Sequence, residues 1–286
     1  STPQPGAGKG SVTGKDHHPR PGAQQSVRSV LGTILLLLTL SSTAADPAEI
    51  AHYGYRVDDK KTQPTDHNYQ GLQNLDGYLY KSLGKYGQSR LLRYDFDDGS
   101  LDTGIRLHPR LFGEGLTVLG DAVYQLTWKN RAMLVYNRDD LSKRQWFPLP
   151  GEGWGLTDNG VKLIYSDGSH RLHFMDPQTG HISHSLDVTE GGSPLKGRLN
   201  ELEWIDGKIW ANIMLSERIV VIDPGSGEVT ASIDLTGLRP RETLKDINQV
   251  LNGIAHNRAD DSIWVTGKRW PWIFRIELVS NASPPP

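Results

Sequence analysis

The chain has 286 residues and no cysteine, which excludes disulfide bonds, thiol catalysis and cysteine-ligated metals. A formal net charge of −2 provides no long-range field that would recruit nucleic acid or an anionic membrane. The length allows one large hydrophobic core or two ordinary ones, and the 31 glycines and 17 prolines are typical of a loop-rich globular protein.

The first 45 residues do not have the composition of a folded domain. Residues 1–27 are rich in Gly, Pro, Ser, Gln and Lys and are too poor in apolar residues to offset the entropy lost on ordering, so we predict disorder. Arg28 then precedes an apolar run at 30–40, followed by small residues, which is the pattern of a secretory signal peptide at 28–45. As a helix this run would rise only ~16 Å, against ~30 Å of membrane hydrocarbon. We predict cleavage near Ala45, export to a secreted or periplasmic location, and no stable membrane association afterwards.

The rest of the chain has the pattern of a β protein. From residue 53 onward, no helical apolar periodicity extends beyond about ten residues. Short runs rich in Val, Ile, Leu, Tyr and Trp alternate instead with Asp-Gly, Asn-Gly and Pro-Gly turn signals. We predict an all-β catalytic domain over residues 46–280 and a disordered tail at 281–286.

A repeated unit runs through this domain. Each copy begins with a turn that enters an apolar strand, and a second strand follows after a tight turn. The copies begin near residues 70, 114, 154, 200 and 252. Steps of 40 to 52 residues leave room for four short strands per copy, as in one propeller blade. The sequence therefore predicts a five-bladed β-propeller.

A ring of blades needs a closed seam, because open strand edges invite pairing with other chains. Residues 53–60 precede the first repeat and have the composition of a strand. We predict that they form the outer strand of the last blade, beside residues 272–278, so that this N-terminal strand closes the ring.

The first strands of the blades would converge on one axis, so their leading residues would share one funnel. These residues are Gln70, Glu114, Trp154, Asn200 and Asn252. The three amide side chains among them would offer donors and acceptors to a peptide-like ligand. The alternative is that they brace loops.

Glu114 is the strongest candidate for an acid or base. It stands between two glycines after Phe112, and burial among aromatic residues would raise the pKa of its carboxyl group towards a useful range. The alternative is a structural glutamate that caps turn amides. Glu152 is also flanked by glycines, and there the structural interpretation is favoured.

Two tryptophans and a lysine complete the candidate site. Trp128 and Trp154 either form a flat cage for a small side chain, with their N–H donors attached, or belong to the core between blades. Lys268 lies at the corresponding turn of the last repeat. It either stabilises an oxyanion or a carboxylate, or is simply solvated.

Nine motifs occur in this order: FGEGLT, YQLTW, PGEGWGLT, SDG, LNELEW, IWAN, RIVVIDP, VLNGIA and VTGKRWP. Together they resemble the plant and bacterial glutaminyl cyclases, five-bladed propellers that convert N-terminal glutamine to pyroglutamate. The resemblance runs from about residue 55 to residue 278. It implies a glutaminyl-peptide cyclotransferase that releases ammonia from peptides or proteins with N-terminal glutamine. We expect a monomer that needs neither a redox cofactor nor a catalytic metal, although a structural cation in the channel stays possible.

The resemblance also implies roles for individual residues. Glu114 takes the place of the family's acid/base, and Lys268 that of its lysine. The implied substrate-binding residues are Gln70, Phe112, Trp128, Trp154, Asn200 and Met214. Asn68 and Met214 stand where the family has aromatic residues, and Lys81 stands where it has glutamate. From these departures we expect an altered substrate preference or efficiency rather than inactivity.

Two other functions stay open. A calcium-dependent propeller hydrolase, such as a lactonase, would use Glu114, Asn200 and Asn252 as oxygen ligands. Calcium takes six to eight oxygens, and the funnel is aromatic and poor in carboxylates. A propeller that only binds peptides is the non-enzymatic alternative, and the departures at Asn68 and Met214 keep it open.

Overall fold

The computed structural model describes residues 49–281. The predicted disordered segment, the predicted signal peptide and almost all of the predicted disordered tail lie outside this range. By its internal contacts the chain divides into residues 1–44 and 45–286, and the described residues belong to the second unit. Within residues 49–281, no helix is long and apolar enough to cross a membrane.

The described residues form an all-β domain, which confirms the predicted class. They contain twenty-two strands, and their single helical element is one 3₁₀ turn, Arg241–Thr243. Short strands joined by tight turns are what the alternation of apolar runs and glycine-containing turn signals predicts.

Three sheets have four antiparallel strands each, and in each sheet the strands follow chain order. They are β2 (Tyr69–Leu75), β3 (Tyr78–Leu83), β4 (Arg90–Asp95) and β5 (Leu101–Arg106); β6 (Gly113–Leu119), β7 (Ala122–Thr127), β8 (Ala132–Asn137) and β9 (Lys143–Pro148); and β10 (Leu156–Asp158), β11 (Leu163–Ser166), β12 (Arg171–Met175) and β13 (Ile182–Asp187). A hairpin, β14 (Thr189–Glu190) and β15 (Ser193–Pro194), follows them.

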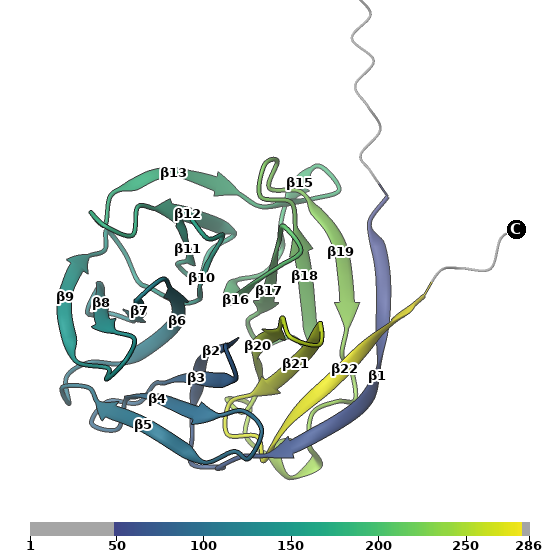
Figure 1. The fold of residues 1–286 in the computed structure, drawn as a ribbon. Helices are drawn as coiled ribbons and strands as arrows, with labels where there is room; N and C mark the ends of the chain where they lie inside the picture. Colours follow the sequence, from purple (N-terminus) through teal and green to yellow (C-terminus); the bar gives the residue numbers. More distant parts are fainter. Residues whose placement is uncertain (1–48, 282–286) are drawn as a thin grey trace, which may run out of the picture. The chain divides into compact units, whose positions relative to one another are not determined.

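A fourth sheet has eight strands. Their order is β16 (Leu199–Ile205), β17 (Lys208–Ile213), β18 (Arg218–Ile222), β19 (Val229–Asp234), β1 (Ala51–Thr62), β22 (Trp272–Ser280), β21 (Ser262–Gly267) and β20 (Leu251–Asn257). It consists of two four-stranded halves, β16–β19 and β20–β22 with β1. In Figure 1 the sheets lie around a common centre.

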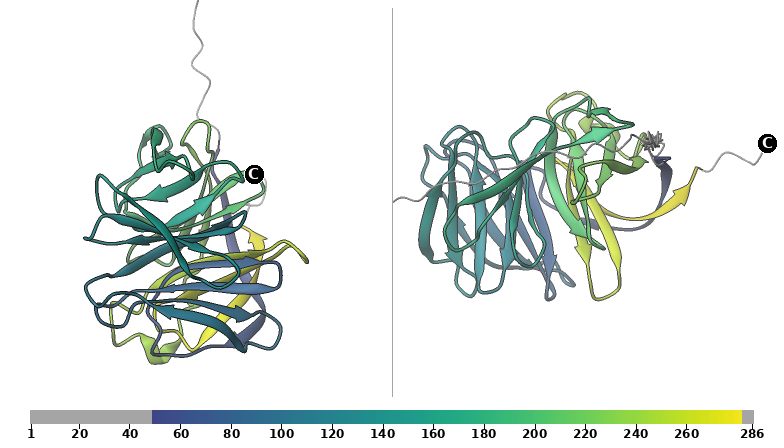
Figure 2. Two further views of the ribbon diagram at one scale, coloured as in Figure 1. Left: turned by 60° about the vertical axis from the view of Figure 1, so that its left-hand side comes forward. Right: turned by 90° about the horizontal axis from the view of Figure 1, so that it is seen from above.

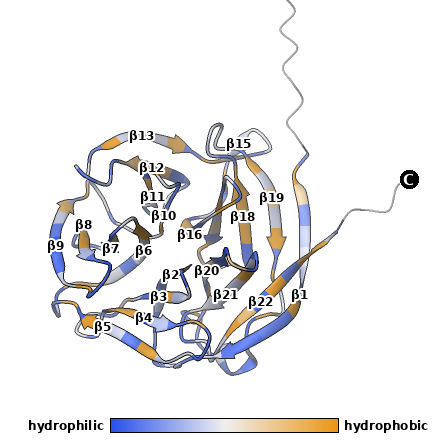
Figure 3. Ribbon diagram, viewed as in Figure 1, coloured by the Kyte–Doolittle hydropathy of each residue, from blue (hydrophilic) through white to orange (hydrophobic). Residues whose placement is uncertain are grey.

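Strand β1 joins the two halves of the large sheet. It pairs antiparallel with β22, with Val57 opposite Ile276, as expected for residues 53–60 and 272–278. It also pairs in parallel with β19, through Tyr53 and Ile233 among others, which the sequence did not predict. The first and last strands of the domain consequently lie side by side in Figures 1 and 2. The second half of β1 is hydrophilic (Figure 3), as suits a strand at the outside of the domain.

Hydrophobic clusters fill the spaces between neighbouring four-stranded units. Leu91 and Val123 belong to a cluster shared by the first and second units. Leu79 and Trp264 belong to one shared by the first and the last. Each unit therefore buries its faces against the units beside it.

The first strands of the units contact one another at the centre. Strand β2 contacts β6 and β20, β10 contacts β6 and β16, and β16 contacts β20. Their backbones approach closely: a Cβ atom on Gly115 would stand 2.4 Å from the backbone nitrogen of Leu156. Glycine is required there, and the glycines after the leading residues of several repeats are a consequence of this packing.

Candidate active site

Local irregularities in the first strands position the polar side chains. In four of these strands the pairing with the second strand is interrupted, at residues 69–71, 113–116, 199–202 and 251–254. The interrupted positions contain Gln70, Glu114, Asn200 and Asn252. A β-bulge disrupts the ladder locally and re-aims a side chain. The same irregularity therefore occurs in four repeats, at the position where the sequence places its candidates.

A cavity of about 270 Å³ lies at these positions. It is lined by Asn68, Gln70, Phe112, Glu114, Trp128, Trp154, Asn200, Met214, Asn248 and Lys268. All eight residues with an expected catalytic or substrate-binding role are among them. Ligand pockets commonly measure about 300–1,000 Å³, so this one suits a single residue rather than a long peptide.

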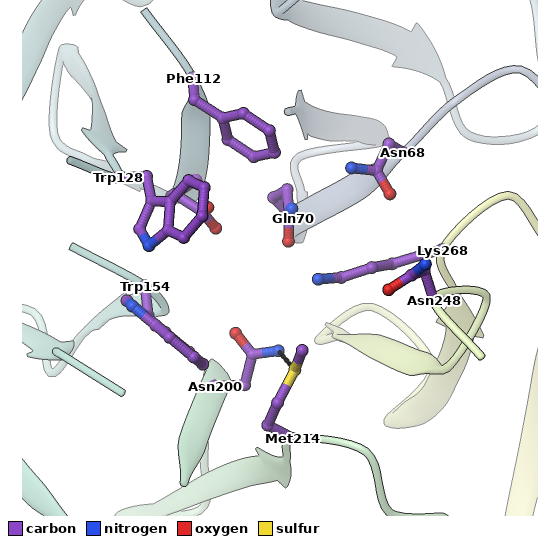
Figure 4. Close-up of a pocket in the computed structure, with 10 residues that line it drawn as sticks. Asn68, Gln70, Phe112, Trp128, Trp154, Asn200, Met214, Asn248 and Lys268 are labelled. Atoms are coloured by element: carbon purple, nitrogen blue, oxygen red, sulfur yellow. Dashed lines mark hydrogen bonds between the residues drawn. The ribbon is translucent and has the colours of Figure 1, made fainter. Parts of the chain in front are cut away.

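The pocket has an aromatic side and a polar side. Figure 4 shows Trp128 and Trp154 on one side, with Lys268 and Asn68 on the other and Gln70 between them. Phe112 extends the aromatic side, with its ring edge-on to Trp128 at a centroid distance of 5.5 Å. A substrate in this space would meet apolar rings on one side and hydrogen-bonding groups on the other.

Glu114 is buried and Lys268 is half-buried, and each changes the other's titration. Burial raises the pKa of the Glu114 carboxyl group well above its usual value; the Lys268 ammonium opposes this rise and the Glu152 carboxylate adds to it. Burial lowers the pKa of Lys268, and Glu114 opposes that change. Within residues 49–281, neither side chain has an ion pair or a hydrogen bond. Glu114 is therefore available to exchange a proton with a ligand.

The indole N–H groups of the two tryptophans already have an acceptor within the protein, so the expected cage does not offer these donors to a ligand. Trp128 Nε1 donates to Glu152 Oε2 at 2.7 Å, and Trp154 Nε1 donates to the same oxygen at 3.0 Å. Figure 4 shows both indole nitrogens on the side of the rings away from Lys268. The two tryptophans therefore present apolar surface to the pocket.

Asn200 and Met214 form one corner of the pocket. The Asn200 Nδ2 group donates to the Met214 sulfur at 3.4 Å (Figure 4), which leaves the amide oxygen free to face a ligand. Asn68, on the other side, donates from Nδ2 to the carbonyl oxygen of Gly84 at 2.6 Å. Of the three positions that depart from the family pattern, Asn68 and Met214 contribute side chains to the pocket, whereas Lys81 does not line it.

Asn252 does not line the pocket, contrary to the expectation that it shares the funnel. It is completely buried, and its Nδ2 donates to the carbonyl oxygen of Tyr69 at 3.0 Å and to Gln70 Oε1 at 3.4 Å. The bulge turns its side chain towards β2 instead of the cavity. Asn252 thus orients Gln70, which is the bracing role considered as the alternative.

The sequence did not identify Asn248, which lies in the segment between β19 and β20. The Arg239 guanidinium holds this segment by donating to the carbonyl oxygens of Thr243 and Asp246, each at 2.6 Å. The segment lies outside the repeated strands, so the repeat pattern gave no signal there. Its place directly before the VLNGIA motif was the one available indication.

The donor set argues against a calcium-dependent hydrolase. Of the three residues that such an enzyme would use, Glu114 and Asn200 line the pocket and Asn252 does not. Within residues 49–281, no group of three or more His, Cys, Asp or Glu side chains is arranged to hold a metal ion. Calcium takes six to eight oxygen ligands, and Glu114 and Asn200 alone do not supply that number.

Comparisons with known proteins point to one family. The model of the glutamine cyclotransferase family matches residues 30–278. A glutaminyl-peptide cyclotransferase of Arabidopsis thaliana is 36% identical over 204 residues, which cover 70% of this chain and 63% of that protein. The chain thus spans less than two thirds of this relative's length. The crystal structure of Myxococcus xanthus glutaminyl cyclase is similar with a TM-score of 0.75 and 30% identity, covering 81% of this chain and 99% of that one.

Proposed function

Because the chain belongs to the glutamine cyclotransferase family, we propose that it converts N-terminal glutamine of peptides or proteins to pyroglutamate with release of ammonia. The observation that carries this proposal is the unpaired, buried Glu114 in a pocket of one-residue size. Such a carboxyl group can move a proton between two nitrogens of the same bound residue.

We propose that the fold is a five-bladed propeller. Its support is the set of five four-stranded units, the contacts among their first strands, and the pairing of β1 with β22. In this arrangement the N-terminal strand completes the last blade and closes the ring, and the pocket lies at the centre where the first strands converge. The folded domain would then extend over residues 46–280.

The two sides of the pocket suit the two parts of a glutamine residue. Trp128, Trp154 and Phe112 pack against its methylene groups. Lys268 and Asn200 hold the carbonyl oxygens, with the Lys268 cation placed to stabilise the oxyanion that develops on the side chain. Binding fixes the rotamer in which the α-amine faces the γ-carbonyl carbon. Well-oriented intramolecular reactions gain up to about 7–11 kcal/mol in this way.

Glu114 transfers the proton. The neutral α-amine attacks the γ-carbonyl carbon, and a nitrogen–carbon bond closes the five-membered lactam. The Glu114 carboxylate accepts a proton from this nitrogen and delivers it to the amide nitrogen, whose bond to carbon breaks as ammonia leaves. The residue ends the cycle unchanged, and proton transfer of this kind contributes about 10²–10⁴ in rate.

The test is ammonia release from a glutaminyl dipeptide by wild type and Glu114→Gln. We expect turnover to fall by about 10²–10⁴ in the variant, with binding of the pyroglutamyl dipeptide retained. Asp121→Asn removes a carboxylate from a surface ion pair with Arg144 and serves as the control. A folded wild type that binds the dipeptide without turnover would instead support the peptide-binding alternative.

The proposal also covers the cofactor requirement, the location and the oligomeric state of the enzyme. We propose that it needs neither a metal nor a redox cofactor, because Glu114 and Lys268 supply the proton transfer and the positive charge. Unchanged turnover after EDTA treatment would support this. We also propose that the protein works as an exported monomer, on the signal-peptide pattern at 28–45. Secretion of the full chain with removal of that segment, and light scattering of the product, check this.

A further inference from the structure

One carboxylate oxygen joins the two tryptophans of the pocket. Glu152 lies in the loop between β9 and β10, and its Oε2 atom accepts both indole N–H groups, at 2.7 Å from Trp128 and 3.0 Å from Trp154. Trp128 directly follows β7, whereas Trp154 precedes β10 in the next sheet. The shared acceptor therefore connects side chains from two different sheets.

We propose that Glu152 is a positioning residue that fixes the two indoles as one wall of the pocket. The assignment of that pocket to N-terminal glutamine rests on the proposed function; the shared hydrogen bonding itself does not. With one acceptor for two donors, neither ring can rotate without breaking a charge-assisted hydrogen bond. An indole has one polar atom, so the acceptor decides which edge of each ring faces away from the cavity.

The loop that carries Glu152 is itself anchored beside Trp128. The backbone N–H of Gly153 donates to the carbonyl oxygen of Thr127 at 3.3 Å, and a Cβ atom on Gly153 would stand 2.9 Å from Leu126 Cβ. The glycine thus allows the loop to lie directly against the end of β7. Glu152 reaches both indoles from this fixed position.

A cation lies over the face of each of the two indoles. The Lys129 ammonium lies 4.4 Å from the centroid of a Trp128 ring, and the Arg198 guanidinium lies 4.2 Å from that of a Trp154 ring. Each indole therefore contacts a cation through its face and the Glu152 carboxylate through its N–H. Cations are attracted to the negative face of an indole, whereas the positive N–H edge attracts an anion. Both contacts hold the rings in the same orientation.

Three substitutions distinguish the position of the acceptor oxygen of Glu152 from the negative charge of its carboxylate. Glu152→Gln keeps an acceptor oxygen at the same distance and removes the charge. Glu152→Asp keeps the charge but withdraws it by one methylene group, too far to reach both indoles. Glu152→Leu removes both properties at similar volume. Asp121→Asn, in a surface ion pair, is the control for the loss of one carboxylate.

If Glu152 acts by placing an acceptor oxygen within hydrogen-bonding distance of both indoles, the variants fall into two groups. We expect Glu152→Gln to keep a KM for the glutaminyl dipeptide within about threefold of wild type, since its amide oxygen still accepts both N–H groups. Glu152→Asp and Glu152→Leu should raise KM about tenfold, the loss that corresponds to about 1.4 kcal/mol, with a smaller change in kcat at saturating substrate. A KM for Glu152→Asp near wild type, with Glu152→Gln impaired, would overturn the proposal.

A spectroscopic measurement tests the shared hydrogen bonding of the two indoles to Glu152 without any measurement of turnover. In ¹⁵N-labelled protein, the indole N–H resonances of Trp128 and Trp154 are assigned with Trp→Phe variants. Both should move upfield in Glu152→Leu and Glu152→Asp and stay near their wild-type positions in Glu152→Gln. Movement of one resonance alone, or of neither, overturns the shared acceptor. An inactive wild type whose variants show these same shifts would refute the proposed function and still support the positioning role of Glu152.

Discussion

Gly155 lies directly against Asn200: a Cβ atom on residue 155 would stand 1.9 Å from the Asn200 carbonyl oxygen. Ser166 links the same two backbones, because its hydroxyl accepts the Gly155 N–H at 2.8 Å and donates to the Asn200 carbonyl oxygen at 2.7 Å. The neighbouring pocket residue Trp154 is thereby held at a fixed distance from Asn200. The geometry of the pocket depends on backbone contacts between sheets as well as on its own side chains.

A glycine against Trp154 provides the first prediction. Gly168 has φ +79°, and a Cβ atom there would stand 2.4 Å from Trp154 Cε2. We expect Gly168→Ala to push the indole into the pocket and raise KM for the glutaminyl dipeptide by about tenfold, a cost near 1.4 kcal/mol. Steady-state kinetics with the purified variant measure this.

Gly160 provides the matched control for that substitution. Its φ is +84°, and a Cβ atom there would have no neighbour within 4 Å. Both alanine variants should lose about 1–2 kcal/mol of unfolding free energy to left-handed backbone strain, whereas KM should change in Gly168→Ala alone. An equal rise of KM in both variants would show that strain, and not contact with Trp154, is responsible.

The second prediction concerns the acidic side of the pH profile. Glu114 must be ionised to accept the amine proton, and its pKa is raised by burial, opposed by Lys268 and increased by Glu152. The value of kcat/KM should therefore fall as pH falls through this raised pKa. Glu152→Gln removes a neighbouring negative charge, which lowers the pKa of Glu114 and moves the acidic limb to lower pH. Lys268→Met should move it to higher pH.

Profiles of kcat/KM for wild type and these two variants check the signs, because kcat/KM reports the pKa values of the free enzyme. Asp121→Asn should leave the limb in place. A limb that stays in place in both pocket variants would mean that another group titrates there.

Sequence patterns predicted positions along the chain better than side-chain directions. The glycine-flanked Glu114 was found because the close approach of first strands at the centre of the domain requires glycine, and that requirement is visible as a repeat. Asn252 occupies the equivalent position of its own repeat, but its bulge turns the side chain towards Gln70. A repeat fixes where a residue lies in a strand, and the local bulge decides where its side chain points.

Contacts made by non-repeating segments could not be predicted. The indoles of Trp128 and Trp154 were expected in the pocket, but their N–H groups bond to Glu152, whose reach depends on the path of its loop. Asn248 lies in a segment that the repeat does not cover. In the fold, the antiparallel partner of β1 followed from the need to protect an edge, whereas its parallel pairing with β19 left no pattern in the sequence.

The third prediction concerns Glu201, which stands where other repeats have glycine. Its buried carboxylate accepts the backbone N–H groups of Leu72 at 3.2 Å and Ile254 at 2.8 Å, and so connects β16 with β2 and β20. In Glu201→Gln, the NH₂ group would face one of these donors. We expect a loss of about 1–3 kcal/mol of unfolding free energy, the usual cost of an unsatisfied buried group.

The pH dependence of stability distinguishes this charge from the hydrogen bonds. Burial, with a contribution from Glu203, raises the pKa of Glu201 well above its usual value. The folded state therefore binds this proton more tightly than the unfolded state, and stability falls as pH rises from the unfolded pKa towards the folded one. Denaturant unfolding across that range should show a shallower slope in Glu201→Gln. An unchanged slope would contradict the raised pKa.

The last prediction concerns Lys268, the cation on the polar side of the pocket. Its ammonium has no ion-pair partner within residues 49–281, so its charge is available to an oxyanion on the bound glutamine. We expect Lys268→Met to lower kcat by about 10²–10³, as for other groups that stabilise a developing oxyanion. Lys208→Met removes an equal charge from a surface pair with Asp223 and should leave kcat unchanged.

Ammonia release measured at the pH optimum of each variant separates the loss of the Lys268 charge from the shifted titration of Glu114. If kcat recovers fully at the new optimum, Lys268 acts only through the pKa of Glu114, and the carbonyl oxygen must be stabilised by Asn200 or Gln70 instead.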